Sequence, residues 1–401
     1  MDKELLSSAT AVRDAVKEEL TLYLAQQRDY LTSIASELTP VCDALEDYLL
    51  EGGKRLRPLF AYAGFMAAGS VPSKTEIRAM ASLELLQACA LIHDDLMDGS
   101  DTRRGKPAIH RHFENLHRQG SMAGLAEQFG EAAAVLLGDL ALVWSDHMLH
   151  NSGLSHDALT AALRIHDEMR IELMAGQYLD VREAGEREHS VERSLRIARY
   201  KSGKYTIERP LHLGAVMARP TASEHSELLN VLSAYGLPLG EAFQLRDDLL
   251  GIFGDPKETG KPAGDDLREG KRTVLMAMTL EKSQGAARAE LVNNLGNPDL
   301  SSEKIESLRA LIVETGAVAD VEKLIDRLGE ESRAAANSSA IHADARPFLL
   351  ALAETAIRRS HYGQKSKRPN RSCRDCRCRS WWTQRRTSLG RCWSQGHCCR
   401  T

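Results

Sequence analysis

Apolar residues repeat along this chain at the spacing of α-helices, and some segments are apolar on almost every helical face. Between Leu83 and Ile92 nearly every position is apolar, which is typical of a helix buried on all sides rather than of an amphipathic surface helix. The segments Met169–Val181 and Leu228–Phe253 have a similar character, with polar residues only at selected positions. We therefore predict a buried helix in each of these three segments.

Helix starts and loops divide the rest of the chain. Ser73-Lys-Thr-Glu76 and Thr221-Ala-Ser-Glu224 each follow a proline and have the form of a capping box, which opens a helix. The pattern predicts an all-α protein built as a single large helical bundle. Loops are expected near residues 99–108, 184–193, 254–271 and 295–301.

The composition agrees with a helical fold. Of the 401 residues 43% are hydrophobic, 27% are charged and only 5% are aromatic, and runs of Val, Ile and Thr typical of strands are few. Abundant Ala, Leu and Glu favour helices. Length and composition together are those of an ordinary globular protein with one large core or two smaller ones.

Charge and cysteine content separate residues 360–401 from the rest. This tail holds eleven Lys and Arg residues against one acidic residue, a net charge of +10, so the remaining residues carry −14 of the total of −4. Six of the eight cysteines lie in the tail, and Cys42 and Cys89 alone do not make a disulfide framework. Because the tail has no helical or strand period, we predict a helical domain over residues 1–359 and a disordered tail over 360–401.

Two explanations of the tail cysteines stay open. Cys373, Cys376 and Cys378, followed by His397-Cys398-Cys399, offer thiolates and an imidazole, which are the ligands that zinc prefers. Their spacing matches no established zinc motif, so an end that is not homologous to the domain is the preferred explanation. The positive charge would attract nucleic acid or anionic membrane only without specificity.

The sequence predicts a cytoplasmic protein without a transmembrane segment. Its first four residues include acids, and no apolar stretch of the kind found in secretory signals follows them. The longest apolar candidate for a membrane span, Ala132–Trp144, is interrupted by Asp139.

Two acidic clusters lie in otherwise apolar helical stretches. The first, Asp94-Asp95-Leu-Met-Asp98, places its first and last carboxylates on one helix face, because residues four apart are neighbours there. That arrangement suits Mg²⁺, which takes one or two carboxylates and fills its other positions with water and phosphate oxygens. An isolated acidic run is equally typical of a helix cap or a solvated surface, but the apolar residues before Asp94 favour a metal site.

Basic motifs stand on both sides of the first acidic cluster. Gly52–Pro58 reads GGKRLRP, and Arg103-Arg104-Gly105 follows the cluster. Glycines let backbone amides approach an anion, and Lys and Arg donate to phosphate oxygens. One such cluster alone is more often a solvated surface, but its combination with acidic helices predicts a site for metal ions and diphosphate.

The second acidic cluster contains Asp247 and Asp248, with Gln244 one turn before Asp248. Beyond it, Gly260-Lys261-Pro262 and the segment Asp265–Lys271 form a loop of mixed charge. Such a loop would close over a charged substrate and exclude water, although by itself it is also typical of an exposed turn.

Across residues 20–359 the chain resembles the trans-isoprenyl diphosphate synthases of the polyprenyl synthetase family. Five motifs occur in the order of that family: GGKRLRP, the apolar helix ending in DDLMD, RRG, Lys201-Ser202-Gly203, and FQLRDDLLGIFGD with its following lysines. The resemblance implies the all-α isoprenoid synthase fold with a central catalytic cavity, and a homodimer. It also implies a head-to-tail (1'-4) condensation of isopentenyl diphosphate with an allylic diphosphate, which lengthens the product by five carbons.

The resemblance also implies residue roles. Asp94 and Asp98 would hold two Mg²⁺ ions and Asp247 a third, with Mn²⁺ as a possible substitute and Asp95 and Asp248 in support. The cations expected to neutralise the allylic diphosphate are Arg103, Lys201 and Lys261, and Lys271 belongs to the closing loop. The residues expected to bind the diphosphate of isopentenyl diphosphate are Lys54, Arg57, Gln87 and Arg104. Oxygens facing the allylic cation would come from Ser202 and Gln244, and the pocket would also be lined by Gln177 and Asp180.

Two departures from the family pattern stand in these motifs. Gly251 occupies the third acidic position of the second cluster, so a third carboxylate must come from elsewhere, and Asp255 is a candidate. Ser202 stands where Thr is common and retains the hydroxyl.

In the family the product length depends on side chains one turn before the first Asp of the acidic helix. Here Cys89 and Ala90 are both small, whereas fifteen-carbon synthases often carry aromatic residues there. We therefore expect a deeper pocket and a twenty-carbon product, geranylgeranyl diphosphate, with Leu86 or Leu83 as the next floor.

Two other functions remain open at this point. A class I terpene cyclase also uses an acidic helix and Mg²⁺, but needs one diphosphate site and would not require both GGKRLRP and RRG. A catalytically silent partner subunit of a prenyl synthase is the second alternative, and the intact acidic clusters argue against it.

Overall fold

The computed structural model describes residues 3–186, 190–255 and 264–358. The chain divides into two compact units, Met1–Tyr362 and Gly363–Thr401, and every described residue belongs to the first. The cysteine-rich tail and Lys261 lie outside the described residues.

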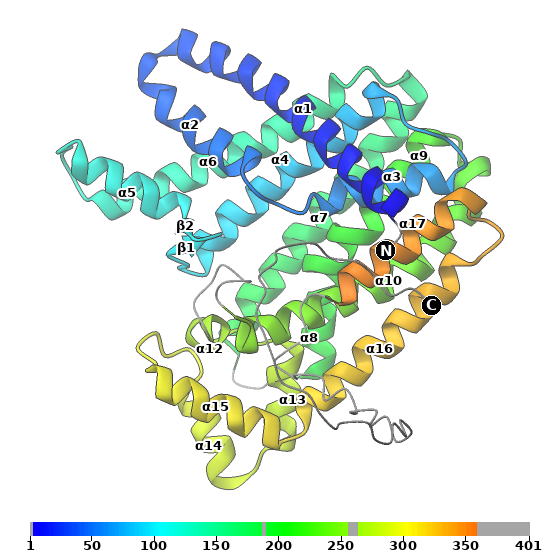
Figure 1. Cartoon of the computed structure of the whole chain (residues 1–401). Coiled ribbons are helices and arrows are strands. Elements are labelled where there is room, and N and C mark those ends of the chain that lie inside the picture. The colour runs from blue at the N-terminus through cyan, green and yellow to red at the C-terminus, as the bar shows by residue number, and fades with distance from the viewer. Residues whose placement is uncertain (1–2, 187–189, 256–263, 359–401) are drawn as a thin grey trace, which may run out of the picture. The chain divides into compact units, whose positions relative to one another are not determined.

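The described residues are almost entirely helical, as predicted (Figure 1). Their only strands are β1 (Thr102–Arg103) and β2 (Lys106–Pro107), which form a short antiparallel ribbon. The α-helices of the first half are α1 (Lys3–Ile34), α2 (Thr39–Leu50), α3 (Leu56–Ala67), α4 (Lys74–Met97), α5 (Ile109–Gln119), α6 (Ala126–His150) and α7 (His156–Ala184). Those of the second half are α8 (Val191–Ile197), α9 (Arg209–Ala218), α10 (Ala222–Phe253), α12 (Asp265–Glu269), α13 (Val274–Lys282), α14 (Gly285–Asn294), α15 (Ser302–Glu314), α16 (Ala317–Ala336) and α17 (Arg346–Ile357). A π-helix, η2 (Ala198–Glu208), joins α8 to α9, and η1 (Ser36–Leu38) and η3 (Ala343–Ala345) are short 3₁₀ turns.

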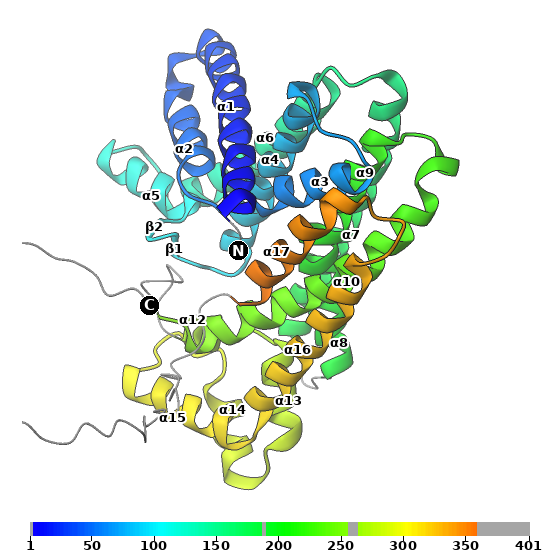
Figure 2. The ribbon, with the colours of Figure 1, turned by 45° about the vertical axis from the view of Figure 1, so that its right-hand side comes forward.

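Two long helices carry the predicted acidic clusters and lie deep in the bundle. α4 packs against α6, α1 and α3, while α10 packs against η2, α16, α9 and α17. α1 and α2 pack side by side as a hairpin (Figures 1 and 2). Leu83 and Leu86 on α4 and Leu232 and Leu245 on α10 are fully buried, so the prediction of buried helices in these two segments is confirmed.

The prediction for Met169–Val181 is wrong on one face. Met169 and Leu173 of α7 are buried, but the side chains of Ile171, Met174 and Tyr178 are 68%, 52% and 69% exposed. Their spacing of three and four residues makes a stripe along one side of the helix. An apolar pattern identifies a helix face that avoids water, but it does not say whether the same chain covers that face.

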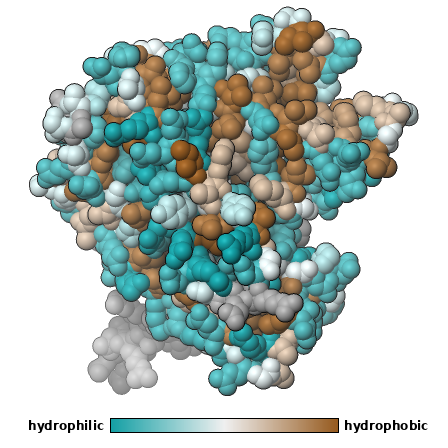
Figure 3. All heavy atoms as spheres, turned by 180° about the vertical axis from the view of Figure 1, so that it is seen from behind, coloured by the Kyte–Doolittle hydropathy of each residue, from teal (hydrophilic) through white to brown (hydrophobic). Residues whose placement is uncertain are grey.

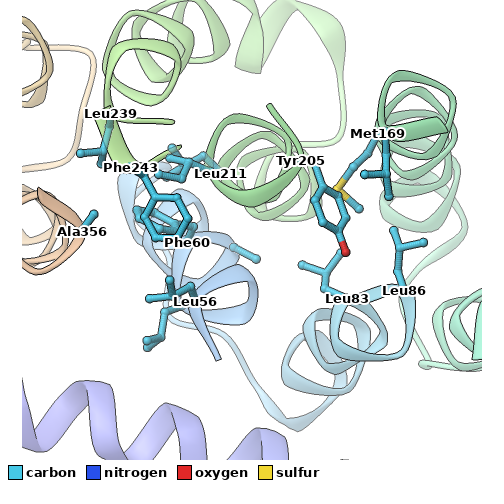
Figure 4. Close-up of a cluster of buried hydrophobic side chains, with 14 of the residues drawn as sticks. Leu56, Phe60, Leu83, Leu86, Met169, Tyr205, Leu211, Leu239, Phe243 and Ala356 are labelled. Carbon is cyan, nitrogen blue, oxygen red and sulfur yellow. The ribbon is translucent and has the colours of Figure 1, made fainter. Parts of the chain in front are cut away.

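The core continues from α3 across α9 and α10 to α17. Figure 4 shows Phe60 with Leu211 and Phe243 on one side, and Leu83 with Met169 and Tyr205 on the other. α3 and α9 touch through glycines: a Cβ on Gly64 would lie 2.0 Å from the Leu211 carbonyl oxygen. Any larger residue at Gly64 would separate the two helices.

Local signals predicted two helix starts correctly, those at Ser73 and Thr221. The capping box at Ser73 is present: its backbone nitrogen donates to Glu76 Oε2 at 2.7 Å and its hydroxyl accepts from the Thr75 backbone. Thr221 is the N-cap of α10. One predicted loop is wrong in part, since residues 254–271 include α12, which begins after Gly264 in the left-handed conformation at φ 71°.

Candidate active site

Each of the three aspartates of the first acidic cluster has a different cation as its nearest partner. Asp94 Oδ1 lies 2.9 Å from Lys201 Nζ, and Asp98 Oδ2 lies 3.0 Å from Lys271 Nζ. Asp95 accepts hydrogen bonds from Arg103 Nε at 2.8 and 3.0 Å and from its Nη2. The side chains of Asp94, Asp95 and Asp98 are 15%, 1% and 17% exposed, so the cluster faces the protein rather than bulk solvent.

Lys201 joins the first acidic helix to α7. Its Nζ lies 2.6 Å from Asp180 Oδ2 as well as contacting Asp94, and Gln177 Nε2 donates to Asp94 Oδ1 at 3.0 Å. Gln177 and Asp180 are both predicted to line the pocket. The fold brings both to the first acidic cluster, more than eighty residues away in sequence.

The second acidic cluster lies on the face of α10 that is directed toward Asp180 and Lys201. Asp248 is buried and accepts from Gln244 Nε2 at 2.8 Å, while Asp247 is half-buried. Asp180, the partner of Lys201, is close enough to act electrostatically on Asp248. The side-chain amide of Gln244, predicted to face the allylic cation, donates here to Asp248. Asp255, the candidate for a third carboxylate, is exposed.

The residues of GGKRLRP divide between the core and the surface. Arg55 is buried in the left-handed conformation and donates to Glu84 Oε2 at 2.7 Å, whereas Lys54 is exposed. Arg57 Nη2 donates to Thr206 Oγ1 at 2.8 Å, and its guanidinium carbon lies 4.1 Å from the centre of the Tyr205 ring.

Tyr205 also connects Arg57 with Gln87. Its hydroxyl donates to Gln87 Oε1 at 2.8 Å, so the fold brings together two residues predicted to bind one diphosphate. Arg104 reaches the glycines of GGKRLRP, since a Cβ on Gly53 would lie 3.6 Å from Arg104 Nη2. Arg104 and Gly105 have φ of 53° and 76°, which is typical of the type I′ turn of a tight hairpin.

The family model of the polyprenyl synthetases matches residues 39–312, which include both acidic clusters and every basic motif described above. The chain belongs to the polyprenyl synthetase family. The predicted family and the helical isoprenoid synthase fold are thereby confirmed, and the chain is a prenyltransferase of the trans-prenyl diphosphate synthase class.

Members of this family with products of different length are similar to the chain. Geranylfarnesyl diphosphate synthase of Aeropyrum pernix is 34% identical over 271 residues, which cover 67% of this chain and 77% of that protein. (2E,6E)-Farnesyl diphosphate synthase of Mycobacterium tuberculosis is 32% identical over 263 residues, covering 65% and 67%. A crystal structure of geranylgeranyl pyrophosphate synthase from Corynebacterium glutamicum, complexed with isoprenyl diphosphate and magnesium, has a TM-score of 0.83 at 42% identity, covering 87% of this chain and 99% of that one.

In this polyprenyl synthetase, glycines let three helices meet at Lys201 and Ser202, which lie on the π-helix η2. A Cβ on Gly176 of α7 would lie 2.4 Å from the Lys201 backbone nitrogen, and one on Gly240 of α10 would lie 2.4 Å from Gly203 Cα. π-Helical turns are frequent at functional sites, where they change the direction of side chains along a helix. The sequence gave no signal for this π-helix.

Burial and nearby charges shift the pKa values of the acidic residues of the site in opposite directions. Burial raises the pKa of Asp94, but the charges of Lys201 and Lys271 outweigh burial and hold that pKa well below its usual value. Burial raises the pKa of Asp98, and the negative charge of Asp94 adds to the rise. Burial also raises the pKa of Asp248 to about 8, and the charges of Asp266 and Asp247 add to the increase.

The side chains present suit Mg²⁺ bound together with diphosphate. Within residues 3–186, 190–255 and 264–358, no three His, Cys, Asp or Glu side chains gather closely enough to hold a metal ion by themselves. Mg²⁺ does not need such a group, because it takes one or two carboxylates and completes its shell with water and phosphate oxygens. Hard carboxylate oxygens at Asp94 and Asp98, already facing ammonium groups, are donors of the required kind.

The residues proposed to set chain length lie on the buried helix α4. Cys89 is buried, with Sγ 3.8 Å from His93 Nδ1, and Ala90 is half-buried. One and two turns earlier, Leu86 and Leu83 are fully buried beside Met169 and Tyr205 (Figure 4).

Sequence reasoning missed several polar residues at the site. Glu269 accepts from Ser100 Oγ at 2.7 Å and lies 2.9 Å from Lys271 Nζ. Tyr205 holds Gln87 and Arg57, although nothing in its neighbourhood in the sequence distinguishes it from a core aromatic residue. The contacts of Ser100 with Glu269 and of Tyr205 with Gln87 join elements that are distant in sequence, and Glu269 and Lys271 belong to a segment of mixed charge. Local sequence patterns do not reveal such contacts.

Proposed function

We propose that this prenyl diphosphate synthase condenses isopentenyl diphosphate with an allylic diphosphate to give geranylgeranyl diphosphate, using Mg²⁺. The observation that carries the proposal is the pairing of Asp94 with Lys201 and of Asp98 with Lys271 beside Asp180 and the second acidic cluster. Carboxylates and ammonium groups in this arrangement can hold the divalent ions and the anionic leaving group in one place.

The chemical barrier in this reaction is largely charge separation, so cations on the leaving diphosphate should carry most of the rate enhancement. Bound Mg²⁺, held by Asp94, Asp98 and Asp247, would neutralise negative charge developing on that diphosphate. Lys201, Arg103 and Lys271 are placed among these acids and would donate to its oxygens, joined by Lys261.

Isopentenyl diphosphate would bind beside this site, near Gln87, which lies two turns before Asp94 on the same face of α4. Arg57 and Gln87 are held together by Tyr205, and Arg104 lies against the glycines of GGKRLRP next to Lys54. These four side chains offer several charged donors and one amide to a diphosphate. Ser202 follows Lys201 on η2, where its hydroxyl would face the allylic cation together with Gln244.

The proposed product has twenty carbons because Cys89 and Ala90 leave room that aromatic residues would fill. Relatives of the chain carry names of fifteen-, twenty- and twenty-five-carbon synthases, so product length varies within this group of similar sequences. The burial of Leu86 and Leu83 beneath these positions supports a floor one or two turns deeper than in a fifteen-carbon synthase.

Mass spectrometry of products from each allylic diphosphate in turn tests the proposed function. We expect farnesyl diphosphate to be extended by one unit, and Ala90→Phe to shorten the product. Ala286→Phe, on the exposed side of α14, is the control and should leave the product unchanged. If no product exceeds fifteen carbons, the proposed chain length is wrong. A cyclised hydrocarbon from one allylic substrate would indicate a terpene cyclase, and no Mg²⁺-dependent turnover would indicate a silent partner subunit.

A homodimer formed through α6 and α7 is part of the proposal. Besides the stripe on α7, Leu136 and Val143 on α6 are 66% and 61% exposed, and apolar side chains form bands among polar ones on the face seen in Figure 3. Exposed apolar surface of this extent marks an interaction site. We expect Met174→Glu to give monomers by light scattering, whereas Val71→Glu, an exposed site elsewhere, should not.

The proposed location is the cytoplasm. Among the described residues, α6 is the one helix that is long and apolar enough to cross a membrane, and half of the relevant stretch is buried within the protein. It packs against α4 and α5, as core helices of globular proteins do.

A further inference from the structure

The second acidic cluster lacks a carboxylate one turn after Asp247, because Gly251 stands at that position. Residues four apart on a helix share a face, so a side chain at Gly251 would project beside Asp247. A carboxylate from another element can reach this place only if nothing projects from Gly251.

The carboxyl group of Asp266 fills this place. An ideal Cβ on Gly251 would stand 1.9 Å from Asp266 Oδ2 and 2.4 Å from its Cγ, distances at which no real side chain coexists. Asp266 is 9% exposed and belongs to α12, so its carboxylate reaches the face of α10 from a different element. A side chain at residue 251 and the carboxylate of Asp266 therefore cannot occupy this volume at the same time.

The position of Asp266 places it between the two acidic clusters. Its negative charge acts on Asp248 of the second cluster and favours the charged form of Lys271, which contacts Asp98 of the first. The Lys271 backbone nitrogen also donates to the Asp266 carbonyl oxygen at 3.0 Å.

Contacts with the first cluster and with a neighbouring loop hold α12 in this place. Ser100 Oγ donates to Glu269 Oε1 at 2.7 Å, on the side of the first cluster. On the other side, a Cβ on Gly270 would lie 2.8 Å from Gly296 Cα, and the Gly296 nitrogen donates to the Leu267 carbonyl oxygen at 2.9 Å. Contacts on two sides, at Glu269 and at Leu267 and Gly270, therefore hold the segment that presents the carboxylate.

We propose that Asp266 supplies the carboxylate that Gly251 cannot, so that α10 and α12 together hold the divalent ion bound at Asp247 with diphosphate. The proposal rests on the function proposed above and adds a residue to it. It assigns the role to Asp266 rather than to Asp255, whose side chain is exposed. It also makes binding of that ion depend on docking of α12 against α10.

Counting bound Mn²⁺ tests this assignment without catalysis. Electron paramagnetic resonance with inorganic diphosphate as the probe measures the number of ions and their affinity in wild type, Asp266→Asn and Asp255→Asn. We expect Asp266→Asn to bind one fewer ion, or to bind it about tenfold or more weakly, with an unchanged melting temperature. Asp255→Asn should match wild type. Equal binding by wild type and Asp266→Asn, or a loss in Asp255→Asn alone, would overturn the proposal.

A double variant separates a ligand from a structural carboxylate. Asp266→Ala should lose the ion, and Gly251→Asp combined with Asp266→Ala should regain it, because the new carboxylate projects into the same volume. If the double variant stays as depleted as Asp266→Ala, a carboxylate in this volume does not bind the ion. Product formation from isopentenyl and farnesyl diphosphates is assayed on the same wild-type preparation: its absence would reject the proposed function while leaving the ion counts interpretable.

Discussion

Gly203 of the π-helix and Gly240 of α10 touch backbone to backbone. A Cβ on Gly240 would lie 2.4 Å from Gly203 Cα and 2.7 Å from its carbonyl oxygen. This contact sets how closely Lys201 and Ser202 approach the second acidic cluster, since they precede Gly203 on the same π-helix.

The contact predicts that Gly240→Ala is destabilising and lowers activity. Overpacking of a dense interior typically costs about 1–3 kcal/mol, and here the displaced element carries Lys201. Urea unfolding and kcat measure the two effects. Gly185→Ala is the matched control, because the nearest atom to its added Cβ is at an ordinary 3.5 Å. A Gly240→Ala protein with wild-type stability and kcat would show that the helices can separate at no cost.

Arg55 and Lys54 are neighbours in sequence, but we predict opposite effects of their substitution. Arg55→Ala leaves Glu84 buried without its 2.7 Å partner, and removing one member of a buried pair costs about 3–5 kcal/mol. Lys54 is exposed, so Lys54→Ala should change the free energy of unfolding by less than about 0.5 kcal/mol and raise the KM for isopentenyl diphosphate. Thermal unfolding with steady-state kinetics checks both, and similar melting temperatures would contradict the prediction.

Tyr205→Phe should affect one substrate selectively. The substitution removes the hydrogen bond to Gln87 and keeps the ring beneath Arg57. It should therefore weaken binding of isopentenyl diphosphate alone. A hydrogen bond of about 1 kcal/mol corresponds to a roughly fivefold rise in KM for isopentenyl diphosphate. The KM for the allylic substrate should not change. Tyr178→Phe, on the exposed stripe of α7, is the control.

The raised pKa of Asp248 predicts a pH dependence of stability in the absence of divalent ions. Burial raises this pKa from 3.8 to about 8, so the folded protein binds a proton that the unfolded chain releases between these values. Stability is therefore favoured at low pH and falls as pH rises toward 8, with a slope of at most about 1.4 kcal/mol per pH unit. Asp248→Asn cannot ionise and should lose this slope in urea titrations from pH 5 to 8. Identical slopes in both proteins would show that Asp248 is already ionised at pH 5.

Part of the site could be predicted from the sequence because its signals are local. The spacing of Asp94 and Asp98 on one helix face, the apolar run before them and the capping box at Ser73 all depend on neighbouring residues. The same local reasoning failed for α7, where Ile171, Met174 and Tyr178 belong to an apolar stripe that this chain leaves exposed.

The sequence by itself determined the helical class of this protein, the place of its acidic and basic motifs, and the missing carboxylate at Gly251. The tertiary structure alone decided that Asp266 rather than Asp255 lies in that place, that Arg55 is internal and Lys54 external, and that Tyr205 joins Arg57 to Gln87. The physical reason is the distance along the chain between the residues that interact. Helical periodicity is set by residues three and four apart, whereas these pairings depend on which helices pack together and on whether a glycine lets their backbones touch.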